Sequence, residues 1–237
     1  MKKFVCMFTL LLGASLTGGA APLCTSGSLD NYLGLPDGCT VGDKWFSNFR
    51  FVSQGDQAPA ASQVLVYVDS AEPLGLAFSS ARWNLDGNDK QQSTIITYMV
   101  TVFSGPDLIS GLTATATNIT ASGPTTGTVT LTKLLCPGGE AGCASPVVLS
   151  GYFTSTTASW LGSATWDPVP VLGVTDRVDL WTGRGTGQKR AILGGVFSNE
   201  FVQIAGGPPV VVPEPHGLGL LALGLGAFVL ARRHRRV

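Results

Sequence analysis

Between residues 21 and 205 the chain alternates short runs of β-branched and aromatic residues with turns that contain Gly or Pro, and this pattern constrains the fold most. Such runs are typical of β-strands, because branched and aromatic side chains pack well on a pleated surface. No amphipathic helical pattern stands out after residue 20. We predict strands over residues 64–68, 94–103, 111–119, 128–134, 147–153, 174–181 and 191–201.

Seven to ten short strands in one stretch predict an all-β fold, an antiparallel β-sandwich or jelly-roll-like single domain over residues 21–205. Thr and Ala alternate over residues 113–117, so we expect the Thr side chains to face water and the Ala side chains to face the core. Trp45, Phe49 and Phe51 lie at odd-numbered positions, so we expect them to share one face of an aromatic first strand.

Charged residues make up 13% of the chain, about half of the usual ~25%. Residues 21–212 hold 9 basic and 14 acidic side chains, which leaves this part mildly acidic. A mildly acidic surface without a basic patch does not suit a nucleic acid, so we expect no nucleic-acid partner.

Four cysteines remain once the leader is removed: Cys24, Cys39, Cys136 and Cys143. An even number of cysteines in an exported chain indicates two disulfides. Three pairings are possible, and the short spacings favour Cys24–Cys39 and Cys136–Cys143. A zinc site is the alternative, which would require the four thiolates to converge.

The N-terminus has the pattern of a secretory signal peptide over residues 1–20. Lys2 and Lys3 precede a short apolar run, and Gly18 and Ala20 supply the small residues that a signal peptidase needs before its cleavage point. A lipoprotein signal at Cys24 is disfavoured because a bulky leucine precedes that cysteine. We therefore expect the chain to be exported.

Residues 213–237 form an apolar tail with a basic end. Residues 217–231 carry no charge and as a helix would measure about 22 Å, short of a ~30 Å hydrocarbon core unless the flanking arginines extend toward the membrane surface. We predict a single C-terminal transmembrane helix whose arginines stay in the cytoplasm. Residues 206–212, rich in Gly and Pro, form the linker to this tail. The basic cluster is Arg232, Arg233, Arg235 and Arg236.

The order of Pro213-Glu214-Pro215, an apolar stretch and a terminal arginine cluster resembles the PEP-CTERM sorting signal of Gram-negative bacteria. The resemblance covers about 25 of the 237 residues. It implies transient retention in the inner membrane and cleavage near the Pro-Glu-Pro motif by an exosortase-type membrane peptidase. It also implies an association with the exopolysaccharide of the cell envelope or biofilm matrix. Both prolines lack an N–H donor and fix φ, which keeps the motif extended for a peptidase.

Histidine is absent from residues 21–212, since the chain holds only His216 and His234. This excludes a Ser-His-Asp or Cys-His catalytic group and a His-ligated zinc in that part. Hydrolysis by two carboxylates remains available to a chain with this composition. Most of its acids lie beside Gly, Asn or Pro, where turn formation explains them equally well.

Residues 84–89 offer four oxygen-bearing side chains within six positions and are the best calcium candidate. Their spacing departs from that of an EF-hand loop, so a turn is favoured and we predict no metal site and no cofactor. Tryptophans usually serve the core. Trp160 and Trp166 lie in a stretch rich in Gly, Ser and Pro, residues 155–170, and we predict that they are exposed as a glycan platform.

These observations predict an exported protein of the cell envelope or extracellular matrix with a structural or adhesive role rather than a catalytic one. Exopolysaccharide is the partner that this location suggests. The first alternative is a carbohydrate-binding module with tryptophan platforms. The second is a glycan hydrolase that uses two facing carboxylates.

Overall fold

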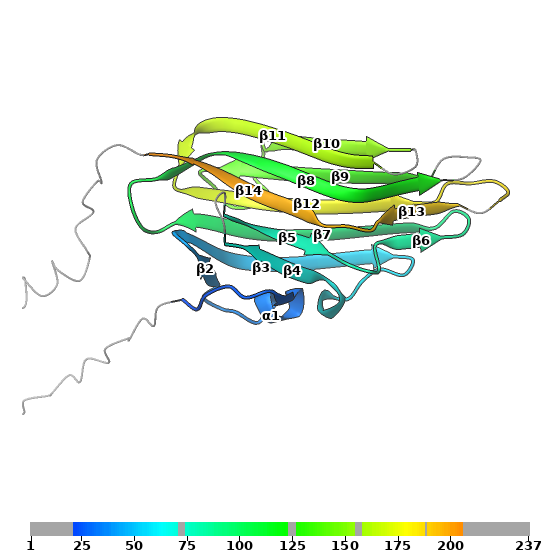
Figure 1. The fold of residues 1–237 in the computed structure, drawn as a ribbon, viewed down its shortest axis with the longest axis horizontal. Helices are drawn as coiled ribbons and strands as arrows, with labels where there is room; N and C mark the ends of the chain where they lie inside the picture. Colours follow the sequence, from blue (N-terminus) through cyan, green and yellow to red (C-terminus); the bar gives the residue numbers. More distant parts are fainter. Residues whose placement is uncertain (1–20, 71–73, 123–126, 155–157, 188, 206–237) are drawn as a thin grey trace, which may run out of the picture.

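The computed structural model describes residues 21–70, 74–122, 127–154, 158–187 and 189–205 (Figure 1). Apart from a five-residue helix, α1 (Leu29–Leu33), and one short 3-10 turn, η1 (Ala61–Gln63), its regular elements are strands. The strands are β1 (Gly27–Ser28), β2 (Cys39–Val41), β3 (Lys44–Gly55), β4 (Leu65–Asp69), β5 (Gly75–Ser79), β6 (Asn84–Asp86), β7 (Gln91–Val102), β8 (Leu108–Ser122), β9 (Thr128–Pro137), β10 (Val147–Phe153), β11 (Ala158–Val169), β12 (Val171–Trp181), β13 (Arg190–Leu193) and β14 (Phe197–Ile204).

The strands form two antiparallel sheets that pack face to face, so the predicted all-β sandwich is confirmed. One sheet has six strands in the order β10-β9-β12-β7-β3-β2. The other has eight, in the order β1-β4-β5-β14-β8-β13-β6, with β11 paired to β8. Thr115 of β8 pairs with Leu161 of β11 and with Ser198 of β14, so β11 and β14 flank β8 on opposite sides. Strands β10 and β11 lie together along one edge of the sandwich (Figure 1).

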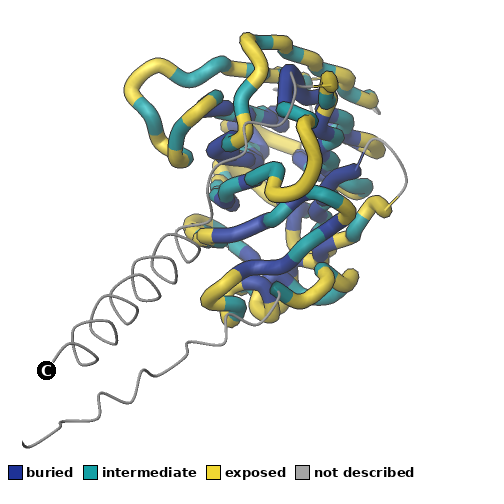
Figure 2. The backbone as a smooth tube through the Cα atoms, turned by 90° about the vertical axis from the view of Figure 1, so that its left-hand side faces the viewer, coloured by how far each residue is buried: buried dark blue, intermediate teal, exposed yellow. Residues whose placement is uncertain are grey.

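The core lies between the sheets, where each strand contributes alternate side chains. Figure 2 shows the buried positions in the interior and the exposed ones along the outside. Over residues 113–117 the two Ala side chains are buried and the three Thr side chains are half-buried or exposed, as predicted from their alternation. Aromatic rings join the layers: the ring centroids of Phe46 on β3 and Phe201 on β14 lie 5.8 Å apart.

A β-bulge in β3 overturns the prediction that Trp45, Phe49 and Phe51 share a face. The pairing of β3 with β7 shifts between Ser47 and Arg50, and Asn48 takes a positive φ of 56°. The extra residue reverses the alternation. Phe49 therefore turns inward and stacks on Tyr98, whereas the Trp45 indole faces outward and donates a hydrogen bond to the Asp37 carbonyl at 2.6 Å.

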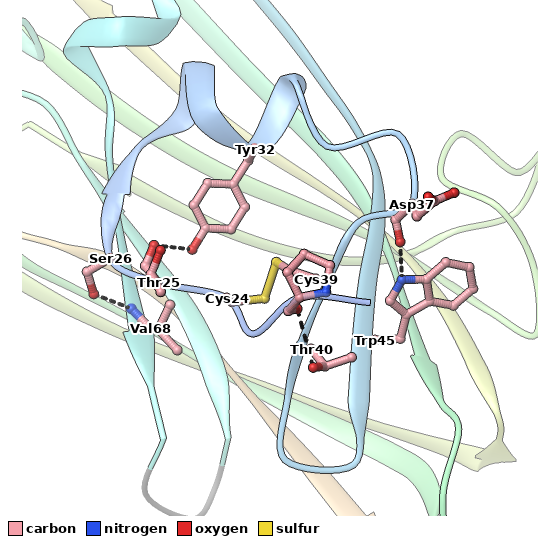
Figure 3. The surroundings of a disulfide bond; sticks show 10 residues. Cys24, Thr25, Ser26, Tyr32, Asp37, Cys39, Thr40, Trp45 and Val68 are labelled. Carbon is pink, nitrogen blue, oxygen red and sulfur yellow. Dashed lines mark hydrogen bonds between the residues drawn. A yellow bond between two sulfur atoms is a disulfide. The ribbon is translucent and has the colours of Figure 1, made fainter. Parts of the chain in front are cut away.

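The four cysteines form the pairs that their spacing favoured, Cys24–Cys39 and Cys136–Cys143. Figure 3 shows how the first bond joins the N-terminal segment to β2. The Thr40 amide donates to the Pro22 carbonyl at 2.8 Å, and the Cys24 amide donates to the Thr40 carbonyl at 2.9 Å. A 15-residue loop of this kind stabilises the fold by about 3 kcal/mol through the restricted unfolded chain.

Strand β11 was not predicted, because residues 155–170 have the composition of a loop. The leader, the linker and the tail lie outside the described residues, and so do the Pro-Glu-Pro motif and the four tail arginines. Within the residues that are described, no helix has both the length and the apolar character to cross a membrane.

Candidate functional site

A hollow of about 550 Å³ opens on the outer face of the six-stranded sheet. Its walls come from β3, β7, β9 and β12, four neighbouring strands, and most of the side chains that line it are polar. The lining consists of Gln54, Gly55, Gln91, Gln92, Ser93, Thr128, Arg177, Asp179, Leu180 and Trp181.

The antiparallel register extends this hollow toward the sheet edge. Five residues from five strands lie opposite one another in one row, in the order Gln54, Ser93, Asp179, Thr130 and Tyr152. Each of them is half-buried or exposed, as expected for the outer face, and the Tyr152 side chain on the edge strand is 67% exposed. We call the hollow and this row together the outer groove.

Trp181, the last residue of β12, lines the hollow and is held in place by its neighbours. Its indole N–H donates a hydrogen bond to Oδ1 of Asp89 at 3.2 Å, and the Arg184 guanidinium donates to Oδ2 of the same carboxylate at 3.1 Å. These hydrogen bonds, with the one from Trp181 the stronger cause, lower the pKa of Asp89. The carboxylate therefore stays ionised at neutral pH and holds the indole in one orientation.

Each carboxylate at the outer groove has a cationic neighbour. Asp179 forms an ion pair with Arg177, whose Nε lies 2.7 Å from Oδ2 of Asp179. Asp56, directly after β3, accepts from the Lys90 Nζ at 2.9 Å and from the Gln91 amide at 3.0 Å. The hydrogen bond from Lys90 is the main cause of the lowered pKa of Asp56. The groove thus offers many polar groups with little net charge, which suits a neutral ligand rich in hydroxyl groups.

Ser93 adds an unused polar atom to the floor of the outer groove. Its Oγ is buried and has no hydrogen-bond partner among the described residues. Buried hydroxyls ordinarily find a partner, because an unpaired one costs free energy. A ligand or a water that reached this position would supply the missing hydrogen bond.

The two tryptophans that the sequence predicted as a glycan platform lie elsewhere, on β11. Both indoles are half-buried and pack against the core. The Trp160 ring lies 5.9 Å from the ring of Phe197, and the Trp166 indole N–H donates to the Ile109 carbonyl at 3.1 Å. Their alternation along β11 points them inward, so Trp181 and Tyr152 are the aromatic side chains better placed for a ligand.

The calcium candidate, residues 84–89, already has cationic partners. Asp86 pairs with Arg190 at 2.6 Å, Asp89 binds Arg184 as described, and the Asn88 amide oxygen accepts from Lys189. The described residues include no cluster of His, Cys, Asp or Glu that could hold a metal. The turn favoured over calcium is present, and it joins β6 of one sheet to β7 of the other.

Hydrolysis by two carboxylates requires a second acid opposite the first at a separation of ~5–10 Å. Among the residues that line the hollow, Asp179 is the single carboxylate.

No protein-family model and no curated protein matches this chain. Among solved structures, TmCBM61 in complex with β-1,4-galactotriose is similar at 12% identity and a TM-score of 0.29, over 65% of this chain and 88% of that one. The enzymatically active domain of a tailspike protein from bacteriophage CBA120 is similar at 11% identity and a TM-score of 0.26, over 66% of this chain and 19% of that one. A carbohydrate-binding module of the β-sandwich superfamily is similar at 9% identity and a TM-score of 0.28, over 78% of this chain and 63% of that one. At such scores these likenesses assign no function.

Proposed function

We propose that this protein is a carbohydrate-binding protein of the cell envelope or extracellular matrix and that the outer groove holds a neutral glycan chain. The observation that carries the proposal is the placement of Trp181 and Tyr152 on one polar face, with the threonine hydroxyls of β9 between them and the glutamine amides of β7 and β3 on the other side of Trp181. Aromatic faces stack on the C–H surfaces of sugar rings, and amide groups such as that of Gln54 both donate and accept hydrogen bonds.

The width of the outer groove favours a chain over a single sugar. Tyr152 lies on β10 and Trp181 on β12, two strands away, which places their backbones roughly 10 Å apart across the sheet. One sugar ring does not bridge that distance, whereas an oligosaccharide does. The paired charges at Asp179 and Asp56 favour an uncharged polysaccharide, because neither carboxylate is free to bind a cationic group.

Trp181→Ala should weaken glycan binding at least 10-fold, which corresponds to about 1.4 kcal/mol, because it removes the stacking surface. The measurement is a titration of the full-length protein in detergent with a panel of neutral polysaccharides, followed by tryptophan fluorescence and calorimetry. Tyr152→Ala should act in the same direction. The matched control is Tyr67→Ala, since Tyr67 is also exposed but lies on the eight-stranded sheet. Equal losses in the Tyr67 and Tyr152 variants would contradict the proposed groove.

The sequence also supports a proposal on sorting, through the signal peptide pattern and the resemblance of the tail to a PEP-CTERM signal. We expect the protein recovered from its native envelope to begin near residue 21 and to end near Pro213, because both ends are processed during export. Intact-mass measurement tests this expectation directly. A mass that includes the tail would contradict cleavage and would indicate a protein that stays anchored by its C-terminal segment.

A further inference from the structure

Three polar side chains meet in the core between the two sheets. Lys133 lies on β9, Asp176 on β12 and Asn199 on β14, and all three are buried. The Lys133 Nζ lies 2.6 Å from Oδ1 of Asp176 and 2.5 Å from Oδ1 of Asn199. The Asn199 Nδ2 donates to Oδ2 of Asp176 at 2.7 Å. An amine, a carboxamide and a carboxylate thus contact one another pairwise.

The surroundings of this trio exclude water. The side chain of Lys133 is 0% exposed and that of Asp176 is 1% exposed. The ring of Phe197 covers the Lys133 Nζ, with 3.6 Å between the nitrogen and the ring centroid. A surface amine exchanges freely between conformations, whereas this one is held against the carboxamide of Asn199. When two reacting groups are held in contact, their reaction becomes intramolecular, and their effective concentration is far above any that is reached in solution.

We propose that Lys133 and Asn199 join covalently through an isopeptide bond that forms within the folded protein, with Asp176 as the catalytic residue that transfers the proton. The bond would tie β9 of the six-stranded sheet to β14 of the eight-stranded sheet. It would therefore cross-link the two layers of the sandwich, as the two short disulfide loops do not.

The reaction needs no co-reactant. The lone pair of the neutral Lys133 amine attacks Cγ of Asn199, and a new C–N bond forms. The bond between Cγ and Nδ2 of Asn199 then breaks, and the nitrogen leaves as ammonia. Asp176 accepts a proton from the Lys133 nitrogen and delivers one to the leaving nitrogen, because it contacts both. An amine and an amide become an amide and ammonia, so nothing is oxidised or reduced.

Burial supports this chemistry in two ways. It lowers the pKa of Lys133 to about 8, against the opposing effect of Asp176, so a useful fraction of the amine is neutral near neutral pH. Tyr98 is fully buried beside Asp176 and Asn199, and burial raises the pKa of its hydroxyl well above the ordinary value. That hydroxyl stays protonated, and its position beside Asp176 and Asn199 lets it donate a hydrogen bond to the oxyanion that forms on Asn199.

A second trio serves as an internal control. Lys44 contacts Gln203 and lies 3.1 Å from Asp43, and Gln203 donates to Asp43 at 2.7 Å. Here the Asp43 side chain is 22% exposed, so water competes for the carboxylate and the amide. We expect Lys44 to remain a free amine.

The test is peptide mapping of the reduced and denatured full-length protein by mass spectrometry. Trypsin should fail to cleave after Lys133, and the peptide from Gln91 to Arg177 should carry the peptide that begins at Ala191 as a branch. The branched species should weigh less than its two parts by one ammonia. Cleavage after Lys133 would overturn the proposal, as would a branch at Lys44 in its place.

Variants identify the partner and the catalytic group. Asn199→Ala and Asp176→Ala should each abolish the branched peptide, and Gln203→Ala should leave it unchanged. Loss of one water in the wild-type protein, with the branch at Asp176, would show that the carboxylate is the acyl donor and would also overturn the proposal. Because the decisive mapping uses the wild-type protein, a variant that fails to fold leaves the result intact.

Discussion

Asp176→Ala is expected to lower the free energy of unfolding by about 3–5 kcal/mol, the range found when one partner of a buried ion pair is removed. In the variant the cross-link to Asn199 does not form, and the Lys133 amine stays in the core without the carboxylate that it contacts in the wild type. Guanidinium-induced unfolding, followed by far-UV circular dichroism, provides the measurement.

The control is a solvent-exposed ion pair whose atoms are as close together as those of the buried pair. Arg190 and Asp86 lie 2.6 Å apart, as Lys133 and Asp176 do, but about half of each side chain is exposed. Solvent screens such pairs, so Asp86→Ala should leave the unfolding midpoint close to that of the wild type. Similar losses in the two variants would show that the buried pair has no special weight.

A double variant separates the cost of an unpaired polar group in the core from the cost of lost packing. Lys133→Met combined with Asp176→Leu removes both charges and fills the space with apolar groups. It should recover part of the stability that Asp176→Ala loses, because no charge then remains unpaired in the core. A double variant as unstable as the single one would locate the effect in packing instead.

Much of the fold follows from local sequence. The predicted strand at residues 147–153 matches β10. The disulfide pairs follow from the short spacings between cysteines that flank turn-rich segments. Strand β11 was missed because its inward positions include Gly162 and Ala164, which contribute little to a hydrophobic pattern. The bulge at Asn48 was missed because one residue in a left-handed conformation leaves no clear mark on a sequence.

The outer groove could not be predicted from the sequence, because its residues meet only through the register of five strands. Gln54 and Asp179 are far apart in the chain, and no local pattern places them in one row. The same limit explains why Trp160 and Trp166 were predicted to be exposed. Local composition suggested a loop there, whereas the alternation of side chains along β11 places both indoles against the core.

The buried trio did leave a signal that alternation could have revealed. Lys133 lies between the buried Leu131 and Leu135, Asp176 between Val174 and Val178, and Asn199 between Phe197 and Phe201. Polar residues in the inward phase of three strands have to satisfy one another in the core. That rule would have grouped the three residues without a structure, although it would not have predicted which atoms contact one another.

The stability of the Asn199→Ala variant should rise with pH between about 8 and 10, whereas that of the wild type should not. In the variant, Lys133 keeps a free amine whose folded-state pKa burial lowers to about 8 from its ordinary value of 10.5. Between these pH values the unfolded chain binds more protons than the folded one, so the free energy of unfolding increases with pH. The full gain is about 3 kcal/mol, absent below pH 8 and complete near pH 10.5.

In the wild type the proposed amide has no proton to lose, so this contribution is missing at every pH. Tyr98 acts alike in both proteins: its raised pKa means that the unfolded chain loses the phenol proton first, which lowers stability above about pH 10 in each. The difference between the two proteins, measured by guanidinium unfolding from about pH 7 to about pH 10, therefore isolates Lys133. A rise in both proteins would show that the wild-type amine is free, and a rise in neither would show that burial does not disfavour its charged form.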